Sequence, residues 1–138
     1  MTAPVIDHIG IIVADLDAAM EMMRALFKSE PAYVKELDDV GLRVAAFEAA
    51  NITVELLQYS GENDAFARRV MGNATGLNHI SARVEDVVQA VAELKAAGFT
   101  PQDGFPRQGA HGQVAFFDPD PVTGLLFEVC EPDAEPEP

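Results

Sequence analysis

Apolar residues follow two alternating periods along this chain, and the same order of segments occurs twice. Helical spacing, which predicts amphipathic helices, occurs at Leu16, Met20 and Met23 and again at Val87, Val91 and Leu94. Each helical segment follows a strand-like apolar run, and Asp15 and Asp86 stand at the expected N-cap positions. Three short β-like runs come after each helix, at about 31–37, 41–49 and 52–59 and at about 99–103, 113–117 and 124–130. Each half of the chain therefore predicts the order β-α-β-β-β.

The two halves also resemble each other residue by residue. Residues 6–10, Ile-Asp-His-Ile-Gly, match residues 77–81, Leu-Asn-His-Ile-Ser, at an offset of 71. Residues 54–56 and 127–129 match at an offset of 73. A βαβββ unit is too small to bury its own sheet, so two tandem modules are expected to pair. The predicted fold class is α+β, with both modules in one curved, cup-like mixed sheet and the helices outside.

The boundaries of this fold follow from the same pattern. We expect one domain over residues 1–131, with modules at about 4–60 and 75–131. The connector 61–74 is predicted to hold a short amphipathic helix that ends at Gly72. Residues 132–138 alternate acids and prolines, which is typical of a disordered tail.

Charge and cysteine content narrow the function classes. The 138 residues include 9 basic and 23 acidic side chains, a formal net charge of −14, which disfavours nucleic acid or anionic membrane as a partner. The single cysteine, Cys130, excludes an internal disulfide and a multi-cysteine zinc site. The chain has neither an apolar run of about 20 residues nor a signal-peptide pattern at its start, so a cytoplasmic protein is expected.

Two histidines and two glutamates recur at matching places in the halves. His8 and His79 lie early in the first strand of each half, and Glu55 and Glu128 lie in the last strand of each, between aliphatic residues. An unpaired carboxylate costs several kcal/mol to bury, so a positive partner is expected. Two imidazoles and two carboxylates suit a divalent first-row metal with open positions for substrate.

These motifs resemble the vicinal oxygen chelate (VOC), or glyoxalase, superfamily over about residues 5–131. The resemblance is strongest to the methylmalonyl-CoA epimerases, on residues 6–10, 54–57, 76–80 and 126–129 and, more specifically, on residues 107–112. It implies metal ligation by His8, Glu55, His79 and Glu128, with Co, Ni, Zn, Mn or Mg as the ion. Glu128 would be both ligand and catalytic base. The implied reaction is proton abstraction next to a carbonyl through a metal-stabilised enolate, on an acyl-CoA thioester or another carbonyl compound.

Other residues are predicted to contact the substrate. His111 and Gly112 lie in a permissive loop that suits closure over a ligand, and Arg43 and Arg107 are candidate clamps for a carboxylate or phosphate. A homodimer is expected, because the sheet has edge strands and one chain is expected to leave part of the helix face Met20, Met23 and Leu26 uncovered.

Two departures from the epimerase pattern keep alternatives open. Many epimerases carry a second glutamate base where this chain has Val44, and their basic loop is replaced here by the acidic residues 117–121. Glu48 has the same strand parity as Val44, but it lies about 13 Å along the strand at roughly 3.3 Å per residue. A glyoxalase I-like lyase is the second hypothesis, and a non-catalytic small-molecule-binding protein of the same fold is the third. A ring-cleaving dioxygenase is disfavoured, because Glu55 would occupy a position that oxygen needs.

Overall fold

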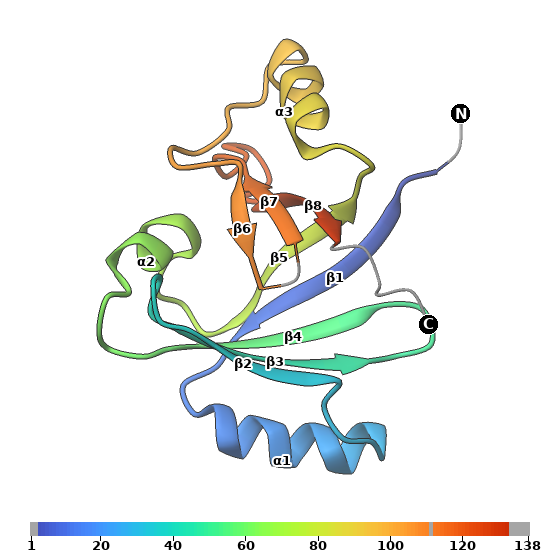
Figure 1. Cartoon of the computed structure of the whole chain (residues 1–138), viewed down its shortest axis with the longest axis vertical. Coiled ribbons are helices and arrows are strands. Elements are labelled where there is room, and N and C mark those ends of the chain that lie inside the picture. The colour runs from blue at the N-terminus through green and yellow to red at the C-terminus, as the bar shows by residue number, and fades with distance from the viewer. Residues whose placement is uncertain (1–2, 111, 133–138) are drawn as a thin grey trace. The chain divides into compact units, whose positions relative to one another are not determined.

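The structure, a computed structural model, describes residues 3–110 and 112–132. They form two compact units: residues 8–80 make the first unit, and the described residues of 1–7 and 81–138 make the second. In chain order the elements are β1 (Val5–Ile12), α1 (Leu16–Phe27), β2 (Tyr33–Leu37), β3 (Leu42–Glu48), β4 (Thr53–Tyr59), α2 (Ala65–Met71), β5 (Gly76–Arg83), α3 (Val87–Ala96), β6 (Arg107–Gly109), β7 (Gly112–Phe116) and β8 (Phe127–Pro132) (Figure 1). Among the described residues, no helix has the length and hydropathy needed to cross a membrane.

Each unit is built around an antiparallel ladder. In the first unit β2, β3 and β4 form this ladder, and β1 pairs with β4 in parallel. In the second unit the ladder consists of β6, β7 and β8. The strand order is β2-β3-β4-β1-β5-β8-β7-β6, in which the neighbours β1 and β5 each run from one unit into the other. The predicted α+β fold with two tandem βαβββ modules is confirmed.

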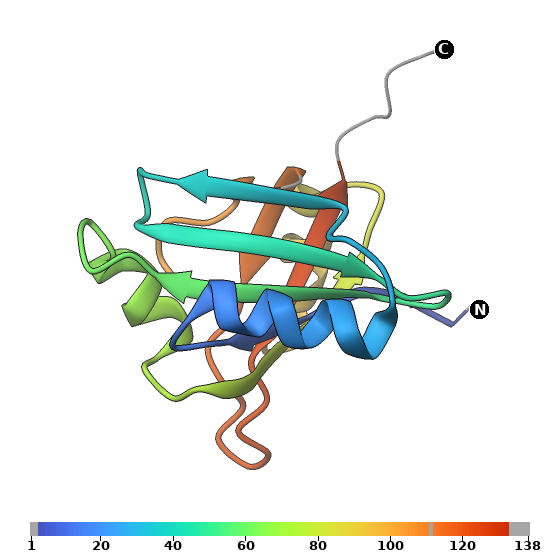
Figure 2. The same ribbon diagram turned by 90° about the horizontal axis from the view of Figure 1, so that it is seen from below.

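Helix α1 covers one face of the first unit's strands (Figure 2). It begins at the predicted cap, where the Asp15 carboxylate accepts a hydrogen bond from the Ala18 amide at 3.1 Å. Its buried stripe, Leu16, Met20 and Met23, packs against residues of β3 and β4 that include Phe47 and Leu56. The expectation that this stripe needs a second chain is wrong for Met20 and Met23, because the unit's own sheet buries them, whereas Leu26 is 66% exposed.

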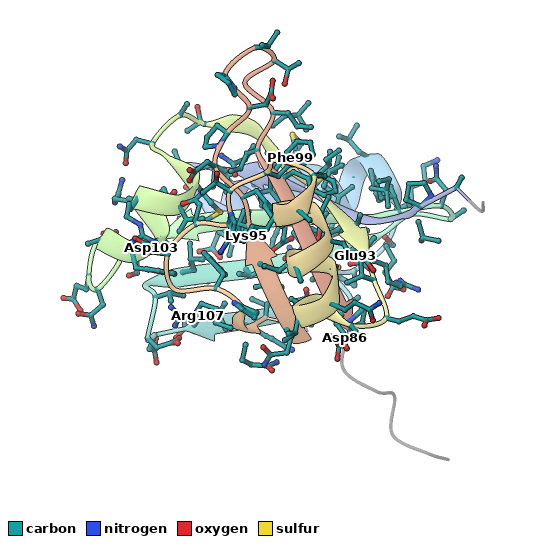
Figure 3. All side chains as sticks on the ribbon, turned by 90° about the horizontal axis from the view of Figure 1, so that it is seen from above. Asp86, Glu93, Lys95, Phe99, Asp103 and Arg107 are labelled. Carbon is teal, nitrogen blue, oxygen red and sulfur yellow. The ribbon has the colours of Figure 1, made fainter. Side chains whose placement is uncertain are left out.

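Helix α3 packs in the same way against β7 and β8 of the second unit (Figure 3, where Asp86 is labelled at the end at which the helix begins). Asp86 accepts a hydrogen bond from the Gln89 amide at 3.1 Å, as the N-cap prediction requires. The buried cluster on this side contains Val87, Phe117 and Val129. The same capping chemistry therefore starts both long helices.

A second contact ties each helix to the last strand of its module. The Leu16 amide, the first in α1, donates to Gln58 Oε1 on β4 at 2.6 Å. The Val87 amide, the first in α3, donates to Glu131 Oε1 on β8 at 3.0 Å. Gln58 and Glu131 each follow the strand glutamate of their module by three residues, at Glu55 and Glu128. One amide that has no partner inside its helix is thereby satisfied in both modules.

The strand predicted at 99–103 is wrong. Only Pro101 forms an isolated bridge there, with Phe117, and the edge strand β6 comes later, at Arg107–Gly109. Pro101 has no amide hydrogen to donate to a ladder, and Gly104 at φ +93° turns the chain. The predicted connector helix is present as α2, and Gly72 is its C-cap, with its amide bonded to the Arg68 carbonyl at 2.8 Å.

Candidate metal centre

The register of the first unit places Glu55 beside Gly10. These two residues are Cα partners across β1 and β4, and Ala46 is the Cα partner of Glu55 across β3. Residues directly opposite one another in a sheet project from the same face, and alternate residues of a strand share a face. His8 therefore projects from the same face as Glu55, opposite to the face that α1 covers.

His8 and Glu55 are in direct contact on this face. His8 Nε2 lies 3.0 Å from Glu55 Oε2, and the two residues are only 6% and 9% exposed. A buried carboxylate needs a hydrogen-bond or charge partner, and His8 supplies one. The predicted pairing of imidazole and carboxylate is present within the first unit.

His79 joins this pair through the small size of Gly10. A Cβ atom on Gly10 would lie 2.1 Å from Cε1 of His79 and 2.5 Å from its Nε2, so no larger residue leaves room for the ring. The His79 ring is 6% exposed, and its centroid is 5.7 Å from that of His8, with the two planes at 86°. His8 therefore lies beside both Glu55 and His79, and all three residues are buried.

The His79 ring is also held at its edge. Its Nδ1 lies 2.8 Å from Asn78 Oδ1, and Asn78 Nδ2 donates to the Met71 carbonyl at 2.8 Å. Metal-binding histidines commonly use one ring nitrogen for such a contact and the other for the ion.

The donor set of the first unit fits a divalent ion. Two ligand atoms about 2.1 Å from one ion, at the roughly 90° angle of neighbouring octahedral positions, are about 3.0 Å apart. His8 Nε2 and Glu55 Oε2 have this separation of 3.0 Å. Imidazole nitrogen and carboxylate oxygen are ligands for zinc and other first-row divalent metals.

An apolar wall lies beside these donors. On the same face the cluster Ile12, Leu42, Val44 and Leu57 is buried together with Ala67 of α2. Val44, which stands where many epimerases have a glutamate, is 1% exposed, and the residue directly opposite Glu55 on β3 is Ala46. The exposed Glu48 lies at the far end of β3, opposite Thr53. Strand β3 therefore brings no carboxylate beside Glu55.

Glu128 belongs to the second unit. It lies on β8, is 4% exposed, and has the buried Phe116 of β7 as its Cα partner. Cys130, two residues further on, is a free and buried thiol. The setting of Glu128 among apolar neighbours matches that of Glu55, its equivalent in the first unit.

The predicted substrate contacts are in different settings. Arg43 projects from the α1 face, where its Nη2 is 3.5 Å from Asp17 and its Nε is 3.7 Å from Glu36, so it lies opposite to the His8–Glu55 face. Arg107 on β6 is the Cα partner of Val114, which is the partner of Cys130, so Arg107 shares the face of Glu128. Gly112 begins β7 at φ +135°. His111 lies outside the described residues.

Two residues of the centre were not singled out from the sequence. Gly10 carries a usable signal, because a glycine inside an apolar strand often marks a close approach by another group. Asn78 is part of the repeated motif, but its contacts with Met71 and His79 depend on where α2 ends.

Comparison with known proteins adds family evidence to this geometry. The profile of the Glyoxalase/Bleomycin resistance protein/Dioxygenase superfamily matches residues 7–117. The chain is 35% identical over 127 residues to the ethylmalonyl-CoA/methylmalonyl-CoA epimerase of Cereibacter sphaeroides, which covers 90% of this chain and 95% of that protein.

Solved structures of related proteins have the same fold. Hypothetical protein BH1468 from Bacillus halodurans C-125 superposes with a TM-score of 0.86 at 27% identity, covering 99% of this chain and 100% of that chain. A variant of the methylmalonyl-CoA epimerase of Streptomyces coelicolor, in complex with 2-nitronate-propionyl-CoA, has a TM-score of 0.80 at 28% identity, with coverages of 99% and 100%. That protein binds an acyl-CoA analogue.

Proposed function

Because the chain belongs to the Glyoxalase/Bleomycin resistance protein/Dioxygenase superfamily, we propose that it is a metal-dependent epimerase of an acyl-CoA thioester, most like methylmalonyl-CoA epimerase. The observation that carries this proposal is the buried contact between His8 and Glu55, with His79 packed over Gly10 beside it. Similarity to the Cereibacter sphaeroides epimerase over 90% of the chain supports the substrate class.

The proposed ligands are His8, Glu55 and His79 of the first unit and Glu128 of the second. The first three have donor atoms and burial that suit a divalent ion, and Glu128 is proposed from its equivalence to Glu55 and from its own burial at 4% exposure. Co, Ni, Zn, Mn and Mg are the candidate ions. When bound, such an ion supplies Lewis-acid stabilisation of the negative charge that develops on a carbonyl oxygen.

Glu128 is the proposed base that removes the proton from the carbon next to the thioester carbonyl. A buried side-chain carboxylate held beside a substrate can accept a proton as a general base, and Glu128 is 4% exposed. Inversion also needs a group that returns the proton from the opposite side. Val44 and Ala46 leave β3 without a carboxylate beside Glu55, so this group comes from another element.

The anionic parts of an acyl-CoA call for cations in a chain with a net charge of −14. Arg107, on the Glu128 face of the edge strand β6 (labelled in Figure 3), is one proposed contact. Lys35 on β2 is its counterpart in the first unit, because its Cα partner is Val44, whose partner Leu57 shares the face of Glu55. The Lys35 ammonium lies over the Tyr33 ring, 4.8 Å from its centroid, on the same face.

The acidic loop before β8 uses one of its carboxylates to hold its own turn. Asp120 Oδ2 accepts hydrogen bonds from the amides of Val122 and Thr123 and from the Thr123 hydroxyl, at 2.8–3.0 Å. The contacts with Thr123, backbone and hydroxyl, followed by the Val122 amide, hold the pKa of Asp120 below its ordinary value. This carboxylate therefore serves the turn itself.

The experiment is proton exchange in heavy water. Protein loaded with Co²⁺ and supplied with methylmalonyl-CoA should incorporate deuterium next to the thioester carbonyl, seen by mass spectrometry even without net conversion. Failure of exchange with full metal content would overturn the CoA substrate. Conversion of the glutathione hemithioacetal of methylglyoxal would then favour the glyoxalase I-like lyase, and inactivity toward both would favour a binding protein.

A homodimer remains part of the proposal on narrower grounds. The edge strands β2 and β6 and the exposed Leu26 and Met22 of α1 support it, whereas Met20 and Met23 do not. Light scattering at micromolar concentration should give twice the mass of one chain, and a monomer with full activity would overturn it.

A further inference from the structure

The side-chain amide of Asn78 joins the end of α2 to a proposed metal ligand. Its Nδ2 donates to the carbonyl of Met71, the last residue of α2, at 2.8 Å. Its Oδ1 lies 2.8 Å from Nδ1 of the neighbouring His79. Only the NH₂ end of an amide can donate to a carbonyl, so the Met71 contact fixes which end of Asn78 faces the histidine.

This orientation decides where the imidazole proton lies. Asn78 Oδ1 is an acceptor without a proton, so Nδ1 of His79 must donate. A neutral imidazole has one N–H, and a proton on Nδ1 leaves the lone pair on Nε2. We propose that Asn78 is a positioning residue that holds His79 in its Nδ1–H tautomer, so that Nε2 is presented as a ligand to a divalent cation. The presence of a divalent cation rests on the proposed function, whereas the assignment of the tautomer does not.

The surroundings keep this arrangement rigid. Gly10 lies so close to the ring that a Cβ there would be 2.1–2.7 Å from three of its atoms, which fixes the ring from one side. The carbonyl to which Asn78 donates is also anchored, because the next residue, Gly72, accepts a hydrogen bond from the Tyr59 hydroxyl at 2.5 Å. Asn78 thereby links the end of the connector helix to the proposed ligand His79.

The matching residue in the other repeat is engaged differently. Asp7 precedes His8 as Asn78 precedes His79, but its carboxylate lies 2.7 Å from Nη2 and 3.1 Å from Nε of Arg83. The hydrogen bond from Arg83 to Asp7 raises the pKa of the guanidinium further above its ordinary value. His8 Nε2 lies 3.0 Å from Glu55 Oε2, so the two histidines are in contact with different groups.

The test reads the tautomer and the metal affinity separately. Long-range ¹H–¹⁵N spectra of the metal-free protein, assigned with a His79→Gln variant, should show His79 as the Nδ1–H form. Asn78→Leu should lose this preference and weaken Co²⁺ binding about 10–100-fold in calorimetry, the range typical of a lost outer contact. Asn78→Asp, which keeps an acceptor for Nδ1 but has no hydrogen to donate to the Met71 carbonyl, should retain the tautomer and lose less affinity than Asn78→Leu.

Asn73→Leu is the matched control. Asn73 lies in the connector, shortly after α2, whereas Asn78 lies on β5. The Oδ1 of Asn73 accepts a hydrogen bond from Arg68 at 2.8 Å, so loss of the Asn73 side-chain amide should leave both the tautomer and the Co²⁺ affinity unchanged. An Nε2–H form in the wild-type protein would overturn the proposal, as would wild-type tautomer and Co²⁺ affinity in a folded Asn78→Leu variant. If Asn78→Leu does not fold, the proposal is judged on the His79 tautomer of the wild-type protein and on the Co²⁺ affinity of Asn78→Asp. Absence of exchange with every acyl-CoA, with the tautomer and Co²⁺ binding as stated, would refute the proposed reaction and leave this inference standing.

Discussion

The two repeats share the βαβββ order but differ in the lengths of their ladder strands and in the apolar clusters that pack on them. In the first unit the ladder strands β2, β3 and β4 have 5, 7 and 7 residues, and apolar clusters cover both faces. In the second unit β6, β7 and β8 have 3, 5 and 6 residues, and the buried cluster lies on the α3 side. Loop segments that contain prolines and glycines precede β6 and β8 in the second unit.

The functional side chains divide in the same way. The first unit carries His8, Glu55 and His79, held by packing against Gly10 and by the contact with Asn78. The second unit carries Glu128, proposed as both base and ligand. A long, well-packed ladder suits ligands that must not move, whereas the second unit has a short edge strand and longer loops. The two modules thus share a framework, whereas the roles proposed for them differ.

The two strand glutamates provide the largest expected difference between the units. Glu128→Gln should reduce deuterium exchange on the order of 10²–10⁴-fold at saturating metal, because a lost acid–base group has that effect. Glu55→Gln should mainly weaken metal binding and recover much of its rate when Co²⁺ is raised. Exchange rates measured over a Co²⁺ titration check this, and chelation with EDTA should lower the melting temperature of the wild-type protein.

Equal rate losses in both variants at saturating metal would contradict this division. The two glutamates would then act alike, as ligands only, and the base would be another residue. Matched far-UV circular dichroism spectra are the control that both variants are folded.

The matching positions Gly10 and Ser81 should respond to alanine in opposite ways. In Gly10→Ala the new methyl group meets the His79 ring at 2.1 Å, and overpacking of this kind costs about 1–3 kcal/mol of unfolding free energy and displaces a ligand. Ser81 is 0% exposed, and among the described residues its hydroxyl has no hydrogen-bond partner, so Ser81→Ala should stay within about 0.5 kcal/mol or stabilise. Urea unfolding of the two variants checks the contrast, and a neutral Gly10→Ala variant with full metal content would refute it.

The contacts that tie the helices to the strands should give the smallest effects. Gln58→Ala removes the acceptor of the Leu16 amide and should cost about 1 kcal/mol. Glu131→Gln keeps an acceptor for the Val87 amide and removes only a negative charge at the start of α3, worth about 0.3–1 kcal/mol. Denaturant midpoints at low and high salt separate the two cases, since only the Glu131 effect should shrink with salt. A larger loss in Glu131→Gln than in Gln58→Ala would show that charge dominates the contact.

Much of the fold was predictable because the signals are local or repeated. The helical stripe at Leu16, Met20 and Met23, the N-caps Asp15 and Asp86 and the Gly72 stop are contained in short segments, and the structure has them as expected. The strand predicted at 99–103 failed because the apolar pattern there takes no account of the amide that Pro101 lacks. Repetition of His and Glu at matching places selected His8, Glu55, His79 and Glu128 as candidate ligands, and all four are buried in the structure.

The amino-acid sequence by itself determined the two βαβββ modules, the acidic character and the residue types of the candidate metal centre, since these depend on period, composition and repetition. Only the tertiary structure decided which face each side chain occupies. Arg43 lies on the α1 face with Asp17 and Arg107 on the Glu128 face, because strand register sets the projection of every second residue. The tertiary structure also decided the roles of Gly10 and Asn78. The His79 ring packs against the backbone of Gly10, and Asn78 contacts the carbonyl of Met71, where α2 ends. Contacts of this kind between distant segments leave no local pattern in the sequence.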